Sequence, residues 1–325
     1  MKGLELAKKF YEECGEPMLR EKFGELMPYL AVGLSGSGSE CFGFDDEVSR
    51  DHDFEPGFCI FLPGEDVIDR RNAFLLERAY AGLPKEFLGF RRSLVQPVGG
   101  ARKGVLRTAE FFRDKAGTPD GEMSISQWLT VPEYYLAEAV NGEVFYDGFG
   151  EVSGIREKLS RYPDDIRRKK LAGNLLLMAQ SGQYNYLRCL KHRETAAAQL
   201  AAVEFTKSTM ETVFLLNNRY QPYYKWSFRA MRELEILPLT AELLEYLITT
   251  DNGEAGAAGD GADIPEGIAS DKYDVMESIA ADIIDELQHQ DLTGASCGDL
   301  EQHAYSVNDR IADAELRNMH VLAGV

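Results

Sequence analysis

The chain has 325 residues and is 44% hydrophobic, which is enough apolar material for two domains and excludes a wholly disordered protein. Its net charge of −19 is uneven, because residues 241–325 carry 19 Asp and Glu against three basic residues and the remainder is close to neutral. No basic face for gripping a nucleic-acid backbone is evident, and no apolar run approaches the roughly 20 residues of a membrane span.

The cysteines point to a reducing compartment. There are five, an odd number, and none shows a paired spacing, so we expect neither structural disulfides nor a zinc site. The first 23 residues mix charges with apolar positions at helical spacing, which is typical of an amphipathic helix rather than a signal peptide. We therefore expect a cytoplasmic protein.

The first part of the chain predicts a small α/β unit. A helix is expected over 4–27, strands over 29–34 and 58–62, a helix over 66–83 and a third strand over 104–112. A turn rich in glycine and serine, 36–39, follows the first strand. A loop at 117–121 suggests that this domain comprises residues 1–120.

The second part, 121–325, predicts an all-α helical bundle. Apart from a short extended piece at 142–147, the apolar spacing indicates a series of helices, at about 151–160, 164–182, 184–218, 222–234, 271–290 and 298–322. Residues 249–267 are rich in Gly, Ala and acids, so a flexible segment is expected there. The fold class is thus α/β (α+β), a small mixed sheet followed by helices.

Asp51 and Asp53 are the strongest candidates for chemistry. Alternate residues of an extended segment project to the same side, and two adjacent carboxylates repel each other unless a cation lies between them. Carboxylate oxygens suit Mg²⁺, and the open backbone of the Gly/Ser turn suits a phosphate. The pattern favours phosphoryl or nucleotidyl transfer; the alternative is a surface turn followed by a solvated acidic loop.

The ordered pair Gly38-Ser39 and Asp51-x-Asp53 resembles the signature of the polymerase-β-like nucleotidyltransferases, including the adenylyltransferases that modify antibiotics. The resemblance implies that Asp51 and Asp53 hold Mg²⁺ and that Gly38 and Ser39 bind the β- and γ-phosphates of ATP. Two further runs, 142–147 and 217–226, resemble an uncharacterised bacterial group in which such a nucleotidyltransferase half is fused to a helical domain of unknown function.

Lys225 has two interpretations. A lysine between aromatic residues commonly lies along an apolar surface with its ammonium group in water. The resemblance implies instead that Lys225 reaches the triphosphate, with Arg219 or Arg229 as helpers. Arg188 and His192 also share a spacing found in helical ribonucleases, a pattern that one pair often shows by chance.

The third carboxylate is where the sequence departs from the family pattern. Related enzymes use an acid on the third strand to bind metal or to deprotonate the acceptor hydroxyl, and the predicted strand 104–112 offers only Glu110. The alternative is that Glu110 faces solvent. Asp147 and Glu133 are weaker candidates from the second part of the chain.

The expected activity is Mg²⁺-dependent transfer of AMP from ATP to a hydroxyl group of a small molecule. Two alternatives remain open. The acceptor is a protein side chain or an RNA end, the latter disfavoured by the missing basic face; or the fold is degenerate and acts as a nucleotide-binding or regulatory module. The sequence leaves the acceptor, the nucleotide base and the oligomeric state undetermined.

Overall fold

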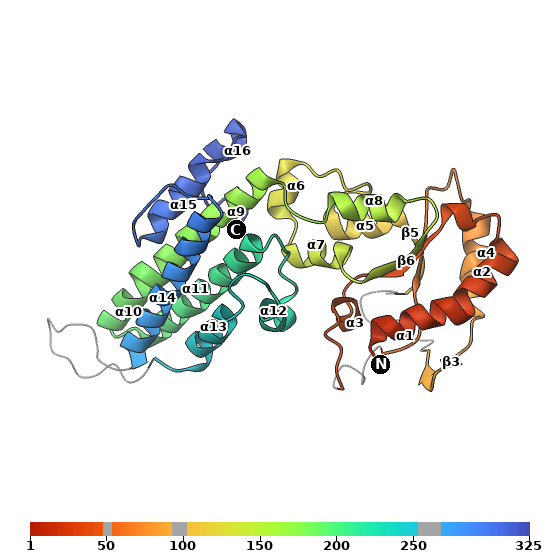
Figure 1. Ribbon diagram of the computed structural model, residues 1–325, viewed down its shortest axis with the longest axis horizontal. Helices are drawn as coiled ribbons and strands as arrows, with labels where there is room; N and C mark the ends of the chain where they lie inside the picture. The colour runs from red at the N-terminus through yellow and green to blue at the C-terminus, as the bar shows by residue number, and fades with distance from the viewer. Residues whose placement is uncertain (48–53, 93–102, 253–267) are drawn as a thin grey trace. The chain divides into compact units, whose positions relative to one another are not determined.

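The computed structural model describes residues 1–47, 54–92, 103–252 and 268–325 and divides into two compact units (Figure 1). The first comprises Met1–Gln127 and Val131–Ser160, and the second Trp128–Thr130 and Arg161–Val325. The first unit extends past the domain end that we placed at residue 120, because a strand from residues 143–147 completes its sheet.

The sheet of the first unit is small and mixed, as the sequence predicts. Its strand order is β5-β2-β1-β6, with β1 antiparallel to both neighbours and β2 parallel to β5. These strands are β1 (Ala31–Leu34), β2 (Cys59–Leu62), β5 (Gly104–Arg107) and β6 (Glu143–Asp147). A separate hairpin pairs β3 (Glu86–Phe87) with β4 (Phe90–Arg91).

Helical segments make up most of the remainder of residues 1–160. They are α1 (Gly3–Phe10), the π-helical turn η1 (Tyr11–Gly15), α2 (Glu16–Phe23), the 3₁₀ turn η2 (Met27–Tyr29), α3 (Ser39–Phe42), α4 (Arg70–Ala81), α5 (Thr108–Ala116), α6 (Ile125–Thr130), α7 (Glu133–Val140) and α8 (Glu151–Lys158). The predicted helix over 4–27 is therefore confirmed for most of its length, with a π-helical turn within it.

The strand predicted over 104–112 is wrong beyond Arg107, where α5 begins. The Thr108 hydroxyl donates to the Leu62 carbonyl at the end of β2, which fixes the junction between strand and helix. The residues that follow, AEFFRDKA, are mostly good helix formers. Glu110 consequently lies on a helix and not on the third strand.

The core of the first unit lies on both faces of the sheet. Ile60 of β2 packs in a buried cluster with Phe10 and Leu19 from the N-terminal helices. Phe61, the next residue along β2, points to the other face and contacts the ring of Phe111 on α5 at 5.3 Å between centroids. Because successive side chains of a strand alternate, a short apolar strand such as β2 is buried on both sides.

The described part of the second unit is helical and contains no strand, so the helical part predicted over 121–325 is confirmed beyond residue 160, whereas β6 of that range joins the first unit. Its helices are α9 (Asp164–Met178), the π-helix η4 (Ala179–Tyr186), α10 (Leu187–Lys191), α11 (Thr195–Leu216), α12 (Tyr224–Met231), α13 (Thr240–Thr249), α14 (Ile268–His289), α15 (Leu300–Asp309) and α16 (Ala314–Asn318). No helix among the described residues has the length and apolarity that a membrane crossing requires.

The single helix predicted over 184–218 is wrong. The α-helix stops at Lys191 and starts again at Thr195, because Arg193 between them has a positive φ of 60°. His192 is the C-cap residue of α10, and its backbone N–H still donates to the Arg188 carbonyl at 3.1 Å. The Arg188 guanidinium lies over the Tyr184 ring, 4.9 Å from its centroid.

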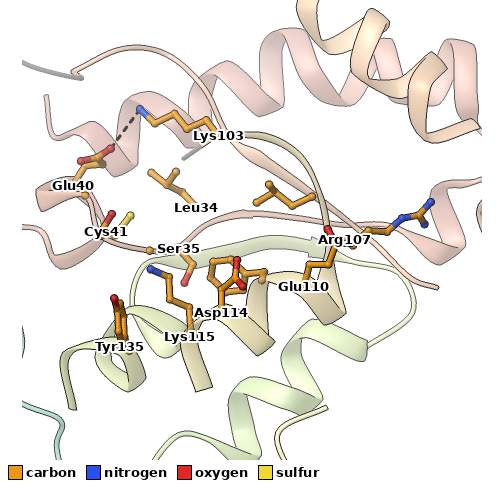
Figure 2. Close-up of a pocket in the computed structure, with 15 residues that line it drawn as sticks. Leu34, Ser35, Glu40, Cys41, Lys103, Arg107, Glu110, Asp114, Lys115 and Tyr135 are labelled. Carbon is orange, nitrogen blue, oxygen red and sulfur yellow. Dashed lines mark ion pairs between the residues drawn. The ribbon is translucent and has the colours of Figure 1, made fainter. Parts of the chain in front are cut away.

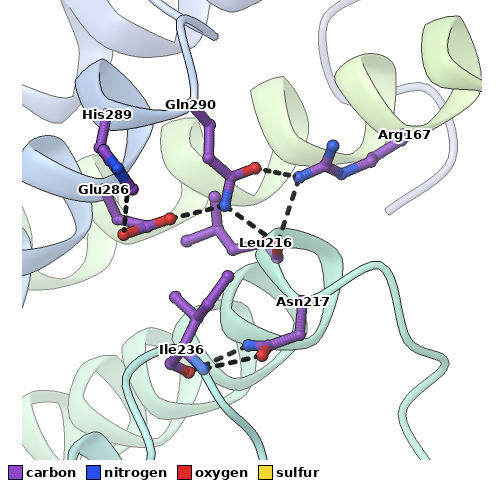
Figure 3. Close-up of polar contacts among 7 residues, drawn as sticks. All are labelled: Arg167, Leu216, Asn217, Ile236, Glu286, His289 and Gln290. Atoms are coloured by element: carbon purple, nitrogen blue, oxygen red, sulfur yellow. Dashed lines mark hydrogen bonds and ion pairs between the residues drawn. The ribbon is translucent and has the colours of Figure 1, made fainter.

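Polar contacts join three helices of the second unit around the end of α11 (Figure 3). Arg167 of α9 donates to the Leu215 carbonyl at 2.7 Å, and Gln290, just after α14, donates to the Leu216 carbonyl at 3.0 Å. Asn217 exchanges two hydrogen bonds with the backbone of Ile236. The bonds from Arg167 and Gln290 thus reach carbonyl groups in the last turn of α11, where intrahelical donors run out.

The flexible segment predicted over 249–267 is wrong for its first residues, 249–252. Thr249 ends α13, and Asn252 is buried, where its side chain accepts a hydrogen bond from Tyr186 and donates one to the Thr195 carbonyl. The rest of that prediction, 253–267, lies outside the described residues.

Candidate functional site

A pocket of about 400 Å³ lies in the first unit, where the turn after β1 faces β5 and α5 (Figure 2). Its volume is within the range of small-molecule sites, roughly 300–1,000 Å³. The lining is strongly charged for a pocket of this size. Its ionisable side chains include Glu40, Lys103, Arg107, Glu110, Asp114 and Lys115.

The Gly/Ser turn is held in place by Asn141, the residue that ends α7. The Gly36 N–H donates to Asn141 Oδ1 at 2.9 Å, and Asn141 Nδ2 donates back to the Gly36 carbonyl at 2.7 Å. Ser35 Oγ donates to the Glu138 carbonyl at 3.0 Å. The Asn141 side-chain amide thus forms a pair of hydrogen bonds with the backbone of the turn, as the backbone of a neighbouring strand would.

Arg156 of α8 also helps to hold the Gly/Ser turn against the end of α7. Its guanidinium donates to the carbonyls of Val140 and Asn141, each at 2.8 Å, and to Ser35 Oγ at 3.1 Å. Burial lowers the pKa of Arg156, but a guanidinium stays protonated in proteins. The turn is therefore preorganised by a cation that also caps the end of α7.

Gly38 and Ser39, the predicted phosphate-binding pair, occupy the step from this turn into α3. Gly38 lines the pocket, and Ser39 is half-buried as the first residue of the short helix. The carboxylate of Glu40 lies against Gly38, since a β-carbon at Gly38 would be 2.3 Å from Glu40 Oε2. Glu40 was not expected from the sequence.

Two carboxylates of α5 face the pocket from the opposite wall. Glu110 and Asp114 lie four residues apart, one helical turn, and both line it. Glu110 is exposed, as the alternative of a solvent-facing residue requires, and its predicted catalytic role stays a prediction. The i, i+4 spacing would have revealed Asp114 if residues 108–116 had been assigned to a helix.

The basic residues of the pocket differ in what they bind. Arg107 points away from the cavity and donates to the carbonyls of Pro63 and Ile68. Lys115 forms a close ion pair with Glu138, and its ammonium nitrogen is 5.2 Å from the centroid of the Tyr135 ring. Lys103 pairs with Glu40.

Asp51 and Asp53, the predicted metal ligands, lie outside the described residues. Within the described ranges, no cluster of three or more His, Cys, Asp or Glu side chains is arranged to hold a metal ion. The weaker candidate Asp147 has a structural contact instead: its carboxylate accepts from the backbone N–H groups of Gly150 and Ser153 and so orders the start of α8.

Lys225 and Arg219 belong to the second unit and are exposed. The Lys225 ammonium lies 5.1 Å from the centroid of the Trp226 ring, a cation–π distance. Lys225 therefore makes the contact with an aromatic ring that is expected of a surface lysine. Its predicted binding to the triphosphate is untested. Next to it, Gln221 donates to Ser227 Oγ at 3.1 Å, which connects the approach to α12 with the helix itself.

Comparison with known proteins gives a match to a family model and a distant similarity to a solved structure. Residues 128–227 match the family described as "Domain of unknown function (DUF4037)", a segment that includes both 142–147 and 217–226. Among solved structures, the chain is similar to a nucleotidyltransferase-like protein from Exiguobacterium sibiricum 255-15, with a TM-score of 0.36 and 9% identity over 86% of this chain and 76% of that one. No curated protein matches in sequence.

Proposed function

We propose that the protein is a nucleotidyltransferase that moves a nucleotidyl group, AMP from ATP, onto a hydroxyl group of a small molecule. The observation that carries the proposal is the pocket of the first unit, where a turn fixed by Asn141 faces the carboxylates of Glu110 and Asp114. Exposed backbone suits phosphate oxygens, and carboxylates suit metal binding or proton transfer.

The donor set fits Mg²⁺ by its chemistry, since the acids concerned are carboxylates with hard oxygen atoms. Asp51 and Asp53 would hold the ion, and they precede β2, the strand beside β5 from which α5 continues. When bound, the ion would neutralise charge on the triphosphate. Phosphate binding and proton transfer would be carried out by the side chains and backbone of the chain itself.

Those roles divide between the two walls of the pocket. The backbone at Gly38 and Ser39 would bind the β- and γ-phosphates; the triphosphate contacts of Lys225 and Arg219 stay predictions from the sequence. Glu110 or Asp114 would accept the proton of the acceptor hydroxyl as its oxygen attacks the α-phosphate and the bond from that phosphorus to the bridging oxygen breaks, releasing pyrophosphate. The proton transfer requires direct contact or one bridging water.

The test is the pair of variants Asp51→Asn and Asp53→Asn, with Glu47→Gln as a matched control in the same acidic stretch. Each aspartate change should abolish Mg²⁺-dependent ATP binding in calorimetry and leave the melting temperature unchanged, because it removes one charged oxygen ligand. Glu47 is exposed, so the control should bind as the unmodified protein does. Unchanged affinity in both aspartate variants would rule out the metal site.

A second candidate is a nucleotide-binding or regulatory module without transferase activity. One observation favours it: β5, the third strand, has the sequence GVLR and carries no acid. Pyrophosphate release separates the two functions. ATP and Mg²⁺ binding without pyrophosphate release, across a panel of sugar, aminoglycoside and protein hydroxyl acceptors, would favour the binding module.

A further inference from the structure

An ion pair lies in the pocket next to the Gly/Ser turn. Lys103 Nζ is 3.4 Å from Glu40 Oε1, and the two side chains are only 11% and 12% exposed (Figure 2). They come from distant parts of the sequence, Glu40 from α3 and Lys103 from the residue before β5. Burying a charge costs free energy, so two nearly buried charges in one small cavity should either stabilise the fold as a pair or bind a ligand.

The space for Glu40 is provided by two glycines. A β-carbon at Gly3 would lie 2.6 Å from Glu40 Cβ, and one at Gly38 would lie 2.3 Å from Glu40 Oε2. Any other residue at either position would therefore displace the Glu40 side chain. As a result, the carboxylate lies against the same turn that we propose to bind phosphate, and an acid there occupies part of the space available to an anionic ligand.

Lys103 is held only loosely by this acid. The 3.4 Å separation is longer than the roughly 2.7–2.9 Å of a charge-assisted hydrogen bond. The ammonium group directs a hydrogen bond to the Glu55 carbonyl at 3.0 Å. A phosphate oxygen at normal hydrogen-bond distance would interact with Lys103 more strongly than Glu40 does, and a lysine binds phosphate as a compact point charge.

We infer that Lys103 binds the polyphosphate part of the substrate and that Glu40 is the counter-ion that an incoming anion displaces. The identity of that anion as a nucleoside triphosphate rests on the proposed function, whereas the anion site itself does not. Glu40 then lowers affinity for anions, so removing its charge strengthens binding. A purely structural ion pair predicts the opposite, because loss of either partner would weaken the fold and the site together.

The experiment measures binding of inorganic tripolyphosphate by calorimetry, with and without Mg²⁺. Lys103→Met should weaken binding about tenfold or more, as expected for loss of a charge-assisted contact. Glu40→Gln should strengthen it about threefold or more, a gain that follows from losing the competing charge. Lys158→Met is the control, because it removes an exposed lysine of the same unit that pairs with Glu122; its affinity should stay within about twofold.

The double variant Glu40→Gln/Lys103→Met covers the case in which a single change unfolds the protein. It removes both buried charges together, so it should remain folded and should bind tripolyphosphate more weakly than the unmodified protein does. Equal affinity in the unmodified protein and the double variant would overturn the inference, as would weaker binding in a folded Glu40→Gln variant. Tripolyphosphate binding through Lys103 without nucleotidyl transfer would overturn the proposed function and support the anion site.

Discussion

Asn141 is the residue on which the shape of the pocket depends most directly. Its amide accepts from the N–H of Gly36 and donates to the carbonyl of the same residue. Asn141→Ala would leave both groups without partners at a half-buried position. We expect a loss of about 1–3 kcal/mol in the free energy of unfolding, measured by urea denaturation, together with weaker tripolyphosphate binding.

Asn141→Asp separates the two bonds. It keeps an acceptor for the Gly36 N–H and removes the donor to the Gly36 carbonyl, so its stability should lie between those of the unmodified protein and Asn141→Ala. A cost as large as that of alanine would show that the bond to the carbonyl dominates. No loss in either variant would contradict the role of Asn141 in holding the turn.

Residues of the site differ in how far the sequence reveals them. Gly38 lines the pocket, and its contiguous motif after an apolar run singles it out in the sequence; its phosphate contact stays a prediction. Glu40 and Lys103 are not singled out, since their pairing depends on space left at Gly3 and Gly38, which no local pattern encodes. Asp51 and Asp53 remain a sequence prediction, because they lie outside the described residues.

Gly142, the residue before β6, affects the packing of that strand against β1. It has a φ of +66°, and a β-carbon there would lie 1.8 Å from the Leu34 carbonyl oxygen at the end of β1. Gly142→Ala should therefore cost about 3 kcal/mol or more, because the added methyl group has to push β6 away from β1. Thermal and urea denaturation would measure the loss.

Gly150 is the matched control for that change. Its φ of +75° is similar, but a β-carbon there would meet no atom within 4 Å among the described residues. Gly150→Ala should cost only the backbone term, about 1–2 kcal/mol. Equal losses at the two glycines would show that backbone strain, and not the contact with β1, explains the effect at Gly142.

The elements themselves were predicted well where one apolar pattern covers one element. The fold class, β1, β2 and the closing helix α14 follow from such patterns. Errors arose where two elements join without a Gly or Pro between them. β5 passes directly into α5 at Thr108, and α10 is separated from α11 by Arg193, whose positive φ has no signature in the sequence.

The stability of the whole molecule should depend on pH through a buried lysine of the second unit. Lys272 is fully buried, and its ammonium group donates to the side chains of Gln199 and Asn252 and to the Thr250 carbonyl. Burial lowers its pKa below the 10.5 of an exposed lysine, and the nearby charge of Asp251 only partly opposes this effect. The lysine is therefore harder to protonate in the folded state than in the unfolded state.

The sign of the effect follows from proton binding. Between the folded pKa of Lys272 and 10.5, the unfolded chain binds more protons, so stability rises with pH, by at most about 1.4 kcal/mol per pH unit. Lys272→Met removes this contribution. In chemical denaturation across the alkaline range, the free energy of unfolding of the unmodified protein should increase with pH relative to that of the variant. A difference between the two that stays constant with pH would contradict the assignment.

β6 also determines when the first unit can be completed as the chain is synthesised. β1 lies between β2 and β6 in the sheet, yet β6 follows α5, α6 and α7 in the sequence. Until Glu143–Asp147 has left the ribosome, one edge of β1 offers its N–H and C=O groups to any strand nearby. The nascent chain thus passes through a stage prone to aggregation, which lasts until translation has moved well beyond β6.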